Sequence, residues 1–540
     1  MKTRLSRNNH NLWTALGVIL IIVLVFAAPL LAAAAANLPP EVRAIIEGPR
    51  YRYARWGIMA QDLQTGQTLC AYNAEQLFSP ASVTKLFTAA AALDRLGPDY
   101  RFRTPLYRRG EIDGKGTLRG DLILVASGDI TMGGRTLPDG RIAYTGIDHT
   151  NGRTGIQASL TKPDHRAGFN QLTTQALRSG IRAIQGEIVI DDRLFKTSSV
   201  YSIINPGATL FLRSPVMIND NLIDVVVNPT RHGALAAVGW RPKSSALQIV
   251  SSIRTVAKDQ PSQIDIHPAG FGKYAASGQI PEGGAAVVRT VVITDASSYA
   301  RALLIEALRK QGVKVKASPV TKNPSEHLPL NGDYRRLVKV GELVSPPLSE
   351  YIRMILKVSH NPGAEILPHL IALPEGKIFF EDAMLLQNRF LAQIITDPGS
   401  ISLSDGSGLS RANLVTPGSV VQLLSYMTTH RNYQVFRDAL PVLGIDGTLT
   451  WTGKESPSQG KILAKTGTLP LVDLLHDSAI ISSKALAGYM TTAKGRMIAF
   501  AFFVNDIHTT DVRGKTETMK LTADTGADLA RIAEALYLAN

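Results

Sequence analysis

Strand-like sequence at the two ends of this 540-residue chain is separated by a long middle segment of different character. Near the N-terminus, "RWGIMAQDLQTGQTLCAYNAE" predicts a hairpin of two alternating runs around Thr65–Gly66. The C-terminal part predicts two strands and a helix, in "ALAGYMTTAKG", "RMIAFAFFVND" and "TADTGADLARIAEALYLA". Residues 100–345 are instead rich in short β-like runs, and helical patterns return from about residue 348. We therefore expect one antiparallel sheet with helices, split in sequence by a long insertion.

Length and composition narrow the possible classes of protein. The chain is too long for one core, so we expect roughly two to four domains, and its 45% apolar and 19% charged content is typical of a globular protein. The single cysteine, Cys70, excludes an internal disulfide and is expected in the core. The basic residues behind the net charge of +14 are scattered, without an aromatic–basic motif, so we expect no nucleic-acid partner.

The N-terminal segment, residues 1–36, predicts an export signal. Three basic residues precede an uncharged run from residue 12 to 36 that ends in alanines suited to cleavage. An uncleaved anchor is the alternative, because the run is long enough to span a bilayer; Pro29 and the alanine tail favour cleavage. We expect an exported protein of the periplasm or cell envelope that touches a membrane only through this segment.

A proline-started helix carries a candidate catalytic pair. In "SPASVTKLFTAAAAL", Pro80 stands where a helix can begin, apolar residues follow at helical spacing, and Gly97 marks the end. Ser82 in the first turn would lie at the positive helix end, which favours a developing oxyanion, with Lys85 one turn on. This motif has two possible interpretations. It is either a nucleophilic serine with its base, or an ordinary helix start with a solvated lysine.

Ser-x-x-Lys alone does not decide between these interpretations, because it occurs three times. Ser159–Lys162 is followed by Pro163, which breaks a helix, and Ser458–Lys461 lies in a loop that enters a strand. Neither is expected to build the same geometry.

Two further motifs favour the catalytic interpretation. "KVSHNPGAE" contains Ser359 and Asn361, and Lys-Thr-Gly occurs once, as Lys465, Thr466 and Gly467, with Thr468 after it. The order Ser-x-x-Lys, Ser-x-Asn, Lys-Thr-Gly is that of class A β-lactamases and penicillin-binding proteins.

The chain closely resembles the penicillin-binding-protein-4-type D-alanyl-D-alanine carboxypeptidase/endopeptidase family (peptidase family S13, DacB-like) over about residues 50–505. The resemblance rests on "SPASVTKLFTAAAAL", "LRGDLILVASGD", "GEIVIDDRLF", "SDGSGLSRANLVTPGSVVQLL", "LPVLGIDGTL" and "AKTGTL", and on the long step from Ser82 to Ser359. It implies an α/β (α+β) multidomain fold: a β-lactamase/transpeptidase-like domain, an antiparallel sheet flanked by helices, split by an insertion that forms two further β-rich domains.

The implied boundaries follow from where these segments lie. Residues 37–100 and 345–540 would form the transpeptidase-like domain, residues 101–212 and 286–344 an inserted domain, and residues 213–285 a third domain nested in it.

The resemblance also implies roles for the motif residues. Ser82 would be the nucleophile and Lys85 its base, which serves only when neutral; burial and the like charge of Lys465 would lower its pKa. Ser359 would relay a proton between Lys85 and the leaving amine, and Asn361 would hold the substrate amide.

The Lys-Thr-Gly strand would hold the other end of the substrate. Lys465 would attract the terminal carboxylate, and Thr466 and Thr468 on either side of Gly467 would hydrogen-bond it. The backbone N–H groups of Ser82 and Thr468 would form an oxyanion hole, in which one donor contributes about 3 kcal/mol.

A pocket for the amino-bearing side chain of the substrate is implied as well. Asp191 and Phe195 in "VIDDRLF" match inserted-domain residues that approach this side chain in the family, and Arg411 in "GLSR" matches a residue near it. A strand-end turn and a surface pair are the alternative interpretation.

Pro368 departs from the family pattern. The family has an unbroken helix after Asn361, whereas Pro362, Gly363 and later Pro368 follow it here. Proline is tolerated in a first turn, but Pro368 is expected to kink or end the helix, which bears on the placing of Ser359.

Residues 469–484, "LPLVDLLHDSAIISSK", are a second departure, because the family has only a handful of residues there. Four apolar residues of this segment need cover, so we expect a partial lid beside the cleft, packed against the inserted domain: Leu474, Leu475, Ile480 and Ile481. The alternative is that the strand after Lys465 runs longer and turns away.

The predicted function is that of a serine-type D-Ala-D-Ala carboxypeptidase that acts on peptidoglycan stem peptides through a Ser82 acyl-enzyme and binds β-lactams covalently. The sequence leaves open whether the protein also has D,D-endopeptidase activity. A β-lactamase or esterase-like hydrolase would need fast deacylation, and a silent wall-binding homologue would not need the intact motifs. We expect no cofactor and no metal, because the 11 histidines lack H-E-x-x-H or similar spacing.

Overall fold

The computed structural model describes residues 38–154, 157–202, 208–270, 272–508, 512 and 514–540. The predicted export signal, residues 1–36, lies outside the described residues. No helix within the described ranges is long and apolar enough to cross a membrane.

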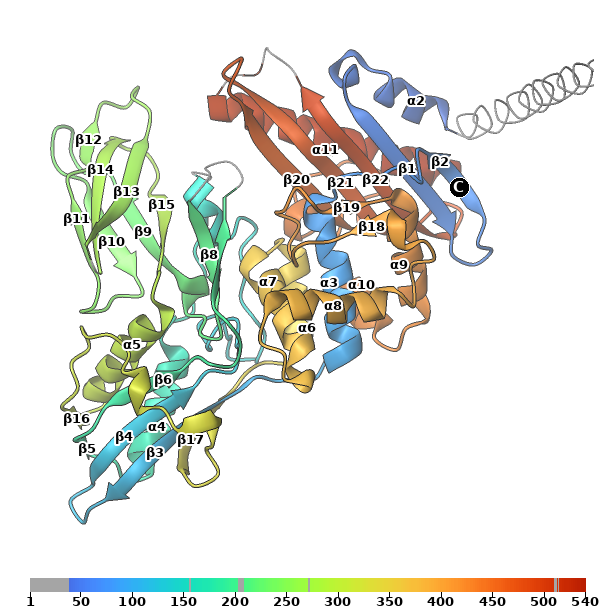
Figure 1. The fold of residues 1–540 in the computed structure, drawn as a ribbon. Coiled ribbons are helices and arrows are strands. Elements are labelled where there is room, and N and C mark those ends of the chain that lie inside the picture. Colours follow the sequence, from blue (N-terminus) through green and yellow to red (C-terminus); the bar gives the residue numbers. More distant parts are fainter. Residues whose placement is uncertain (1–37, 155–156, 203–207, 271, 509–511, 513) are drawn as a thin grey trace, which may run out of the picture.

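A five-stranded antiparallel sheet joins the two ends of the chain (Figure 1). Its strand order is β2-β1-β22-β21-β20. The strands are β1 (Arg55–Asp62), β2 (Thr68–Tyr72), β20 (Ile462–Asp473), β21 (Ser478–Thr491) and β22 (Met497–His508). N-terminal β1 pairs along its whole length with C-terminal β22, so the split antiparallel sheet predicted from the sequence is confirmed.

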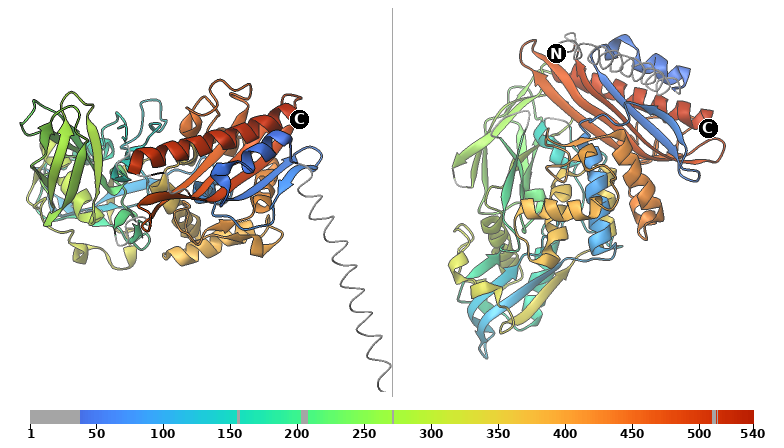
Figure 2. Two further views of the ribbon diagram at one scale, coloured as in Figure 1. Left: turned by 90° about the horizontal axis from the view of Figure 1, so that it is seen from above. Right: turned by 45° about the vertical axis from the view of Figure 1, so that its right-hand side comes forward.

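Helices cover both faces of this sheet, which explains why a central strand such as β22 is buried on both sides. Alternate residues of β22 face two different cores: Phe500 and Phe502 pack toward α2 (Pro40–Ile46) and α11 (Gly514–Ala539). Ala499 and Ala501 face the opposite core, where their small side chains allow close approach of the second helical layer. Figure 2 shows α11 running across the sheet beside α2.

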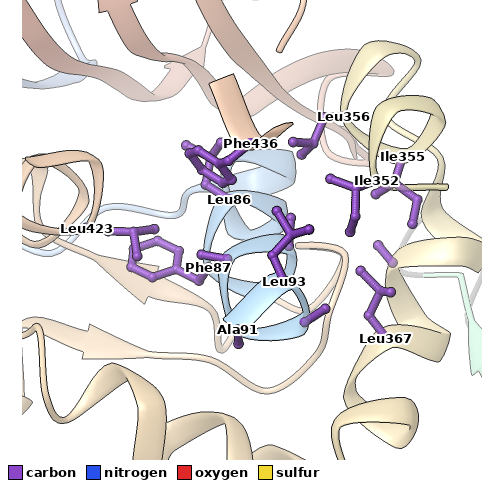
Figure 3. Packing of buried hydrophobic residues seen from close by; sticks show 14 of the residues in the cluster. Leu86, Phe87, Ala91, Leu93, Ile352, Ile355, Leu356, Leu367, Leu423 and Phe436 are labelled. Carbon is purple, nitrogen blue, oxygen red and sulfur yellow. The ribbon is translucent and has the colours of Figure 1, made fainter. Parts of the chain in front are cut away.

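Helix α3 (Thr84–Leu96) forms the centre of the second layer and is buried from Thr84 to Leu93. Gly97 ends it with a positive φ of 78° and a cap hydrogen bond to Leu93, as its sequence predicts. Figure 3 shows Leu86 and Phe87 packed among the surrounding helices, and each such buried side chain contributes roughly 1.5–3 kcal/mol. These helices are α6 (Leu348–Lys357), α7 (Asn361–Ala372), α8 (Phe380–Leu391), α9 (Pro417–Thr429) and α10 (Tyr433–Asp438).

The chain between α3 and α6 forms the β-rich insertion on the left and below in Figure 1. One mixed sheet contains β3 (Arg103–Ile112), β4 (Thr117–Val125), β5 (Ala183–Ile184), β6 (Ile188–Asp191), β16 (Lys314–Val315) and β17 (Val338–Val344). Helices α4 (Ala167–Arg178) and α5 (Ala296–Lys310) pack against it through the shared apolar core.

Shorter strands make up the remaining sheets of the insertion. They are β7 (Ser198–Tyr201), β8 (Thr209–Arg213), β9 (Leu222–Asn228), β10 (Ala237–Arg241), β11 (Gln248–Ser251), β12 (Arg254–Val256), β13 (Gln263–Gly270), β14 (Lys273–Pro281) and β15 (Val287–Val292). The predicted mixed fold with several β-rich units is therefore confirmed, whereas the domain boundaries stay a prediction. Strands β18 (Ile401–Ser402) and β19 (Leu414–Val415) belong to the helical layer's loops.

Of the two effects expected at Pro368, a kink or an end of the helix, the end is wrong, and the kink stays a prediction. Helix α7 continues through Pro368 to Ala372. Proline removes one helical hydrogen bond, but Leu367 and Leu370 on both sides of it are fully buried in the core. Tertiary packing therefore outweighs the local preference.

The expected lid over residues 469–484 is wrong as well. Strands β20 and β21 run longer and close in a turn, so the segment extends the sheet. Ile481 is buried between the sheet and α11, but Leu474 and Leu475 are 88% and 85% exposed. Strand pairing satisfies the backbone of this segment, and its tip remains in solvent.

Candidate active site

The Ser82–Lys85 pair lies where the 3₁₀ turn Ala81–Val83 enters α3, beside the edge strand β20. Ala81 has a positive φ of 44°, which is strained for a residue with a side chain. The backbone at Gly408 packs directly against this turn. A Cβ at Gly408 would lie only 1.8 Å from the Ala81 carbonyl oxygen. Ser82 is thus held in a turn that its own sequence would not favour.

The Lys85 amine is completely buried and has three oxygen neighbours. Lys85 Nζ lies 2.9 Å from Ser82 Oγ, 2.7 Å from Asn361 Oδ1 and 2.6 Å from the Ser407 carbonyl oxygen. Burial lowers the pKa of Lys85 to about 7, against the opposing charges of Asp405 and Glu365. A large fraction of this lysine is therefore neutral at neutral pH.

A neutral Lys85 has one direction left for its lone pair. The carbonyl oxygens of Asn361 and Ser407 only accept hydrogen bonds, so they take both N–H groups of the neutral amine. The lone pair then faces the Ser82 hydroxyl, whose proton it can accept.

The loop 404–413 shapes this environment. The Asp405 carboxylate accepts hydrogen bonds from the backbone N–H groups of Gly408 and Ser410, at 2.7 and 2.6 Å. Glu365, from α7, accepts the Ser407 N–H at 3.0 Å and so orients the Ser407 carbonyl toward Lys85. Sequence reasoning missed Ser407, because a backbone carbonyl leaves no residue-type signal.

Ser359 occupies a strained position between α6 and α7, with a φ of 59°. Its Oγ lies 2.9 Å from Lys465 Nζ, so the relay predicted between Ser359 and Lys85 has its direct contact at Lys465 instead. The next residue, His360, caps α7 through the Gly363 N–H. Its Nε2 lies 3.1 Å from Asp220 Oδ1 of the insertion.

Lys465, on β20, is as buried as Lys85. Its Nζ donates to Ser359 Oγ and to the Thr466 carbonyl oxygen, at 2.9 and 2.8 Å. Burial, followed by the like charges of Lys85 and Lys484, lowers the pKa of Lys465 well below its usual range. An arriving carboxylate would supply the counter-charge that this amine lacks.

At Gly467 the strand β20 lies close against the serine turn. A Cβ there would lie 2.5 Å from the Pro80 carbonyl oxygen, so only glycine fits.

The two threonines beside Gly467 already have side-chain partners. Lys484, the register partner of Thr468 on β21, donates to Thr468 Oγ1 at 2.8 Å, and burial lowers the pKa of Lys484 to about 8. Thr466 Oγ1 lies 2.8 Å from Thr448 Oγ1. Lys484 is a second residue that sequence reasoning missed.

The other two Ser-x-x-Lys pairs have a different environment. Lys162 and Lys461 are both exposed, and the Ser458 hydroxyl is bonded to Ser456. Among the three pairs, the buried lysine in contact with its serine is that of Ser82–Lys85.

The three predicted pocket residues lie apart from this cluster of contacts. Asp191 already pairs with Arg193 at 2.7 Å and accepts a hydrogen bond from Tyr334. Phe195 is 2% exposed and stacks on His369 at 4.1 Å, so in this structure its ring packs the core. Arg411 is exposed on the 404–413 loop. Their contact with a substrate stays a prediction.

Comparison with known proteins identifies the family. A family-wide model of the D-Ala-D-Ala carboxypeptidase 3 (S13) family matches residues 38–525. A D-alanyl-D-alanine carboxypeptidase of Actinomadura sp. (strain R39) is 27% identical, over 91% of this chain and 85% of its own length. The D-alanyl-D-alanine carboxypeptidase DacB of Haemophilus influenzae is 26% identical, over 86% of this chain and 88% of its own.

The fold agrees with that of a solved relative. The crystal structure of penicillin binding protein 4 (dacB) from Haemophilus influenzae superposes with a TM-score of 0.65 and 22% identity, over 94% of this chain and 98% of that one. The family match spans the sheet, the helical layer and the insertion alike. The chain therefore belongs to the S13 family of D-Ala-D-Ala carboxypeptidases.

Proposed function

We propose that this protein removes the terminal D-alanine of peptidoglycan stem peptides through an acyl-enzyme on Ser82. The observation that carries the proposal is the buried Lys85 amine, 2.9 Å from Ser82 Oγ and bonded to two further oxygens. Neutral Lys85 takes the hydroxyl proton as Ser82 attacks the carbonyl carbon of the penultimate D-alanine. The N–H groups of Ser82 and Thr468 stabilise the oxyanion that forms.

The substrate's C-terminal carboxylate binds at Lys465. Because Lys484 donates to Thr468 Oγ1, the Thr468 hydroxyl proton is available to the carboxylate. The Thr466 hydroxyl lies on the same strand and donates to Thr448 Oγ1, so it provides a second contact only by turning from that partner to the carboxylate. Asn361 accepts from Lys85 through Oδ1 and offers its NH₂ group to the substrate amide.

The leaving amine of the terminal D-alanine needs a proton. Ser359 Oγ, which accepts a hydrogen bond from Lys465, donates it, and the proton that Lys85 took from Ser82 then passes to Ser359, which leaves Lys85 neutral again. Water then attacks the Ser82 ester with Lys85 again as the base, and the shortened peptide leaves.

The same acyl-enzyme explains β-lactam binding, because a β-lactam amide acylates the serine and leaves it blocked. A complex of the Haemophilus influenzae penicillin binding protein 4 with a β-lactam exists as a solved structure. We further propose that residues 1–36 direct export, which brings the enzyme to its polymer in the periplasm or cell envelope. No nucleic-acid partner and no cofactor enter this proposal.

A direct assay tests the function. Purified protein lacking residues 1–36 is incubated with a disaccharide pentapeptide and with cross-linked dimers, and released D-alanine and monomers are quantified. We expect D-alanine from the pentapeptide, none from the Ser82→Ala variant, and slow hydrolysis of penicillin. Fast penicillin turnover without D-alanine release would instead assign a β-lactamase, and cleaved dimers would add endopeptidase activity.

A further inference from the structure

Two histidines and one aspartate converge at one end of the five-stranded sheet, outside the active site. Asp473 ends β20, His476 lies in the turn after it, and His508 ends β22. Asp473 Oδ2 lies 2.8 Å from His476 Nδ1 and 2.7 Å from His508 Nε2. One metal-binding atom from each residue lies within 4.8 Å of the other two.

The strand register explains why these side chains meet. Asp473 pairs with Ser478 on β21, and His508 pairs with Ile480 on the same strand. Asp473 and His508 therefore flank β21 on the two sides and reach over it toward each other. This arrangement depends on the extended β20–β21 hairpin, which is the segment that departs from the family pattern.

We propose that Asp473, His476 and His508 bind one divalent transition-metal ion, with Zn²⁺ as the best fit. Two imidazole nitrogens and one carboxylate oxygen suit Zn²⁺, whereas Ca²⁺ and Mg²⁺ prefer sites made of oxygen alone. Three protein ligands leave a fourth tetrahedral position for water. A hollow of about 890 Å³, which His476 and His508 line, gives that water room.

A second cluster within the described residues has the same residue types and serves as a contrast. Asp148, His149 and Asp220 are also close enough to share an ion. There, however, the buried Arg135 guanidinium lies 2.7 Å from both Asp148 and Asp220 and already occupies the place of a cation. At Asp473 the two partners are imidazoles, which are neutral ligands for a metal when deprotonated.

The ion would tie the hairpin turn to the end of β22. A chain with the single cysteine Cys70 has no internal disulfide, so a metal ion supplies a cross-link that this exported protein otherwise lacks. The strand from Thr468 to Asp473 spans about 16 Å. The ion would therefore stabilise the hairpin without touching the reacting groups.

Binding of Zn²⁺ itself tests the proposal. Tag-free protein lacking residues 1–36 is stripped with EDTA, dialysed and titrated with Zn²⁺ by calorimetry, and with Co²⁺ by visible absorption. We expect one ion per chain and the absorption bands of a four-coordinate Co²⁺ site. His476→Ala, His508→Ala and Asp473→Asn should each weaken binding at least about tenfold.

His267→Ala is the matched control, because His267 is also exposed and paired with an aspartate, Asp265 at 3.2 Å, but has no second histidine. It should bind Zn²⁺ like the wild type. All variants should still be acylated by fluorescent penicillin, which checks that they fold. The proposal is overturned if the wild type binds no more tightly than the His476→Ala variant, or if His267→Ala weakens binding equally.

Discussion

The proposed role of Lys85 as a base rests on surroundings that leave its neutral amine one free direction. A solvated lysine would be protonated at neutral pH, with a pKa near 10.4. Burial lowers the pKa of Lys85 to about 7, and the fixed oxygens of Asn361 and Ser407 orient the neutral amine. The residue type was predictable from Ser-x-x-Lys, but this environment was not, because one oxygen comes from the start of α7 and the other from the 404–413 loop, both far away in the sequence.

The rate of penicillin acylation should depend on pH through Lys85. The pKa of this lysine is lowered in the folded protein, so the neutral, reactive form predominates above about pH 7 and is lost as the pH falls below it. We expect the second-order acylation rate to rise with an inflection near that pH. Lys85→Ala should lower the rate by about 10²–10⁴-fold. A profile that stays flat through pH 7, or that inflects near the usual lysine pKa, contradicts this assignment.

Gly467 should tolerate no side chain. In Gly467→Ala the new Cβ would meet the Pro80 carbonyl oxygen at 2.5 Å and push β20 away from the serine turn. We expect about 1–3 kcal/mol less stability in urea unfolding and a large loss of acylation. Gly239→Ala, on strand β10 with no heavy atom within 4 Å of its Cβ position, is the control and should change stability by less than about 0.5 kcal/mol. Equal effects of the two changes would refute the close-approach argument.

At the scale of elements, turn and cap residues correctly predicted those helix ends and hairpins that depend on the local sequence alone. The start of α3 after Pro80, its end at Gly97 and the β1–β2 hairpin all follow from turn and cap residues. The helix end expected at Pro368 and the lid expected over residues 469–484 were wrong, and both lie where tertiary contacts outweigh these signals. Helix α7 passes through Pro368 because its neighbours are buried, and residues 469–484 form a hairpin extension because strand pairing with β22 continues to His508.

The hairpin tip should not control access to the cleft. Leu474 and Leu475 are exposed, so Leu474→Ser/Leu475→Ser should leave stability within about 0.5 kcal/mol of the wild type. The ratio of rates on pentapeptide and cross-linked dimer should also stay unchanged. Ile481→Ala, in the buried part of the same hairpin, should instead lower stability by about 2–5 kcal/mol. A changed ratio of the two rates in the double variant would support the lid hypothesis after all.

At the scale of the whole molecule, the insertion is connected to Lys85 by a series of polar contacts. Arg213, at the end of β8, pairs with Glu365 of α7 at 2.8 Å. Glu365 in turn holds the Ser407 N–H, and the Ser407 carbonyl accepts from Lys85. The insertion was predictable from the β-rich middle of the sequence, but these contacts were not, since single side chains so far apart leave no pattern.

Arg213→Met should disturb this connection. The change leaves the Glu365 carboxyl buried without its charge partner, which lowers stability by about 3–5 kcal/mol. Urea unfolding measures this loss, and acylation kinetics should slow as the Ser407 carbonyl loses its support. Arg335→Met is the control, because Arg335 pairs with Asp333 while its side chain is 89% exposed; it should stay within about 0.5 kcal/mol of the wild type. Equal stability and equal acylation rates of Arg213→Met and Arg335→Met would argue against the connection.

The central claim is that this whole architecture serves one nucleophile, Ser82. Its most direct test is peptide mapping by mass spectrometry after the protein reacts with penicillin. We predict a single adduct on the peptide that contains Ser82, and a folded, unlabelled Ser82→Ala variant. An adduct on Ser159, Ser359 or Ser458, or full labelling of Ser82→Ala, would contradict the account.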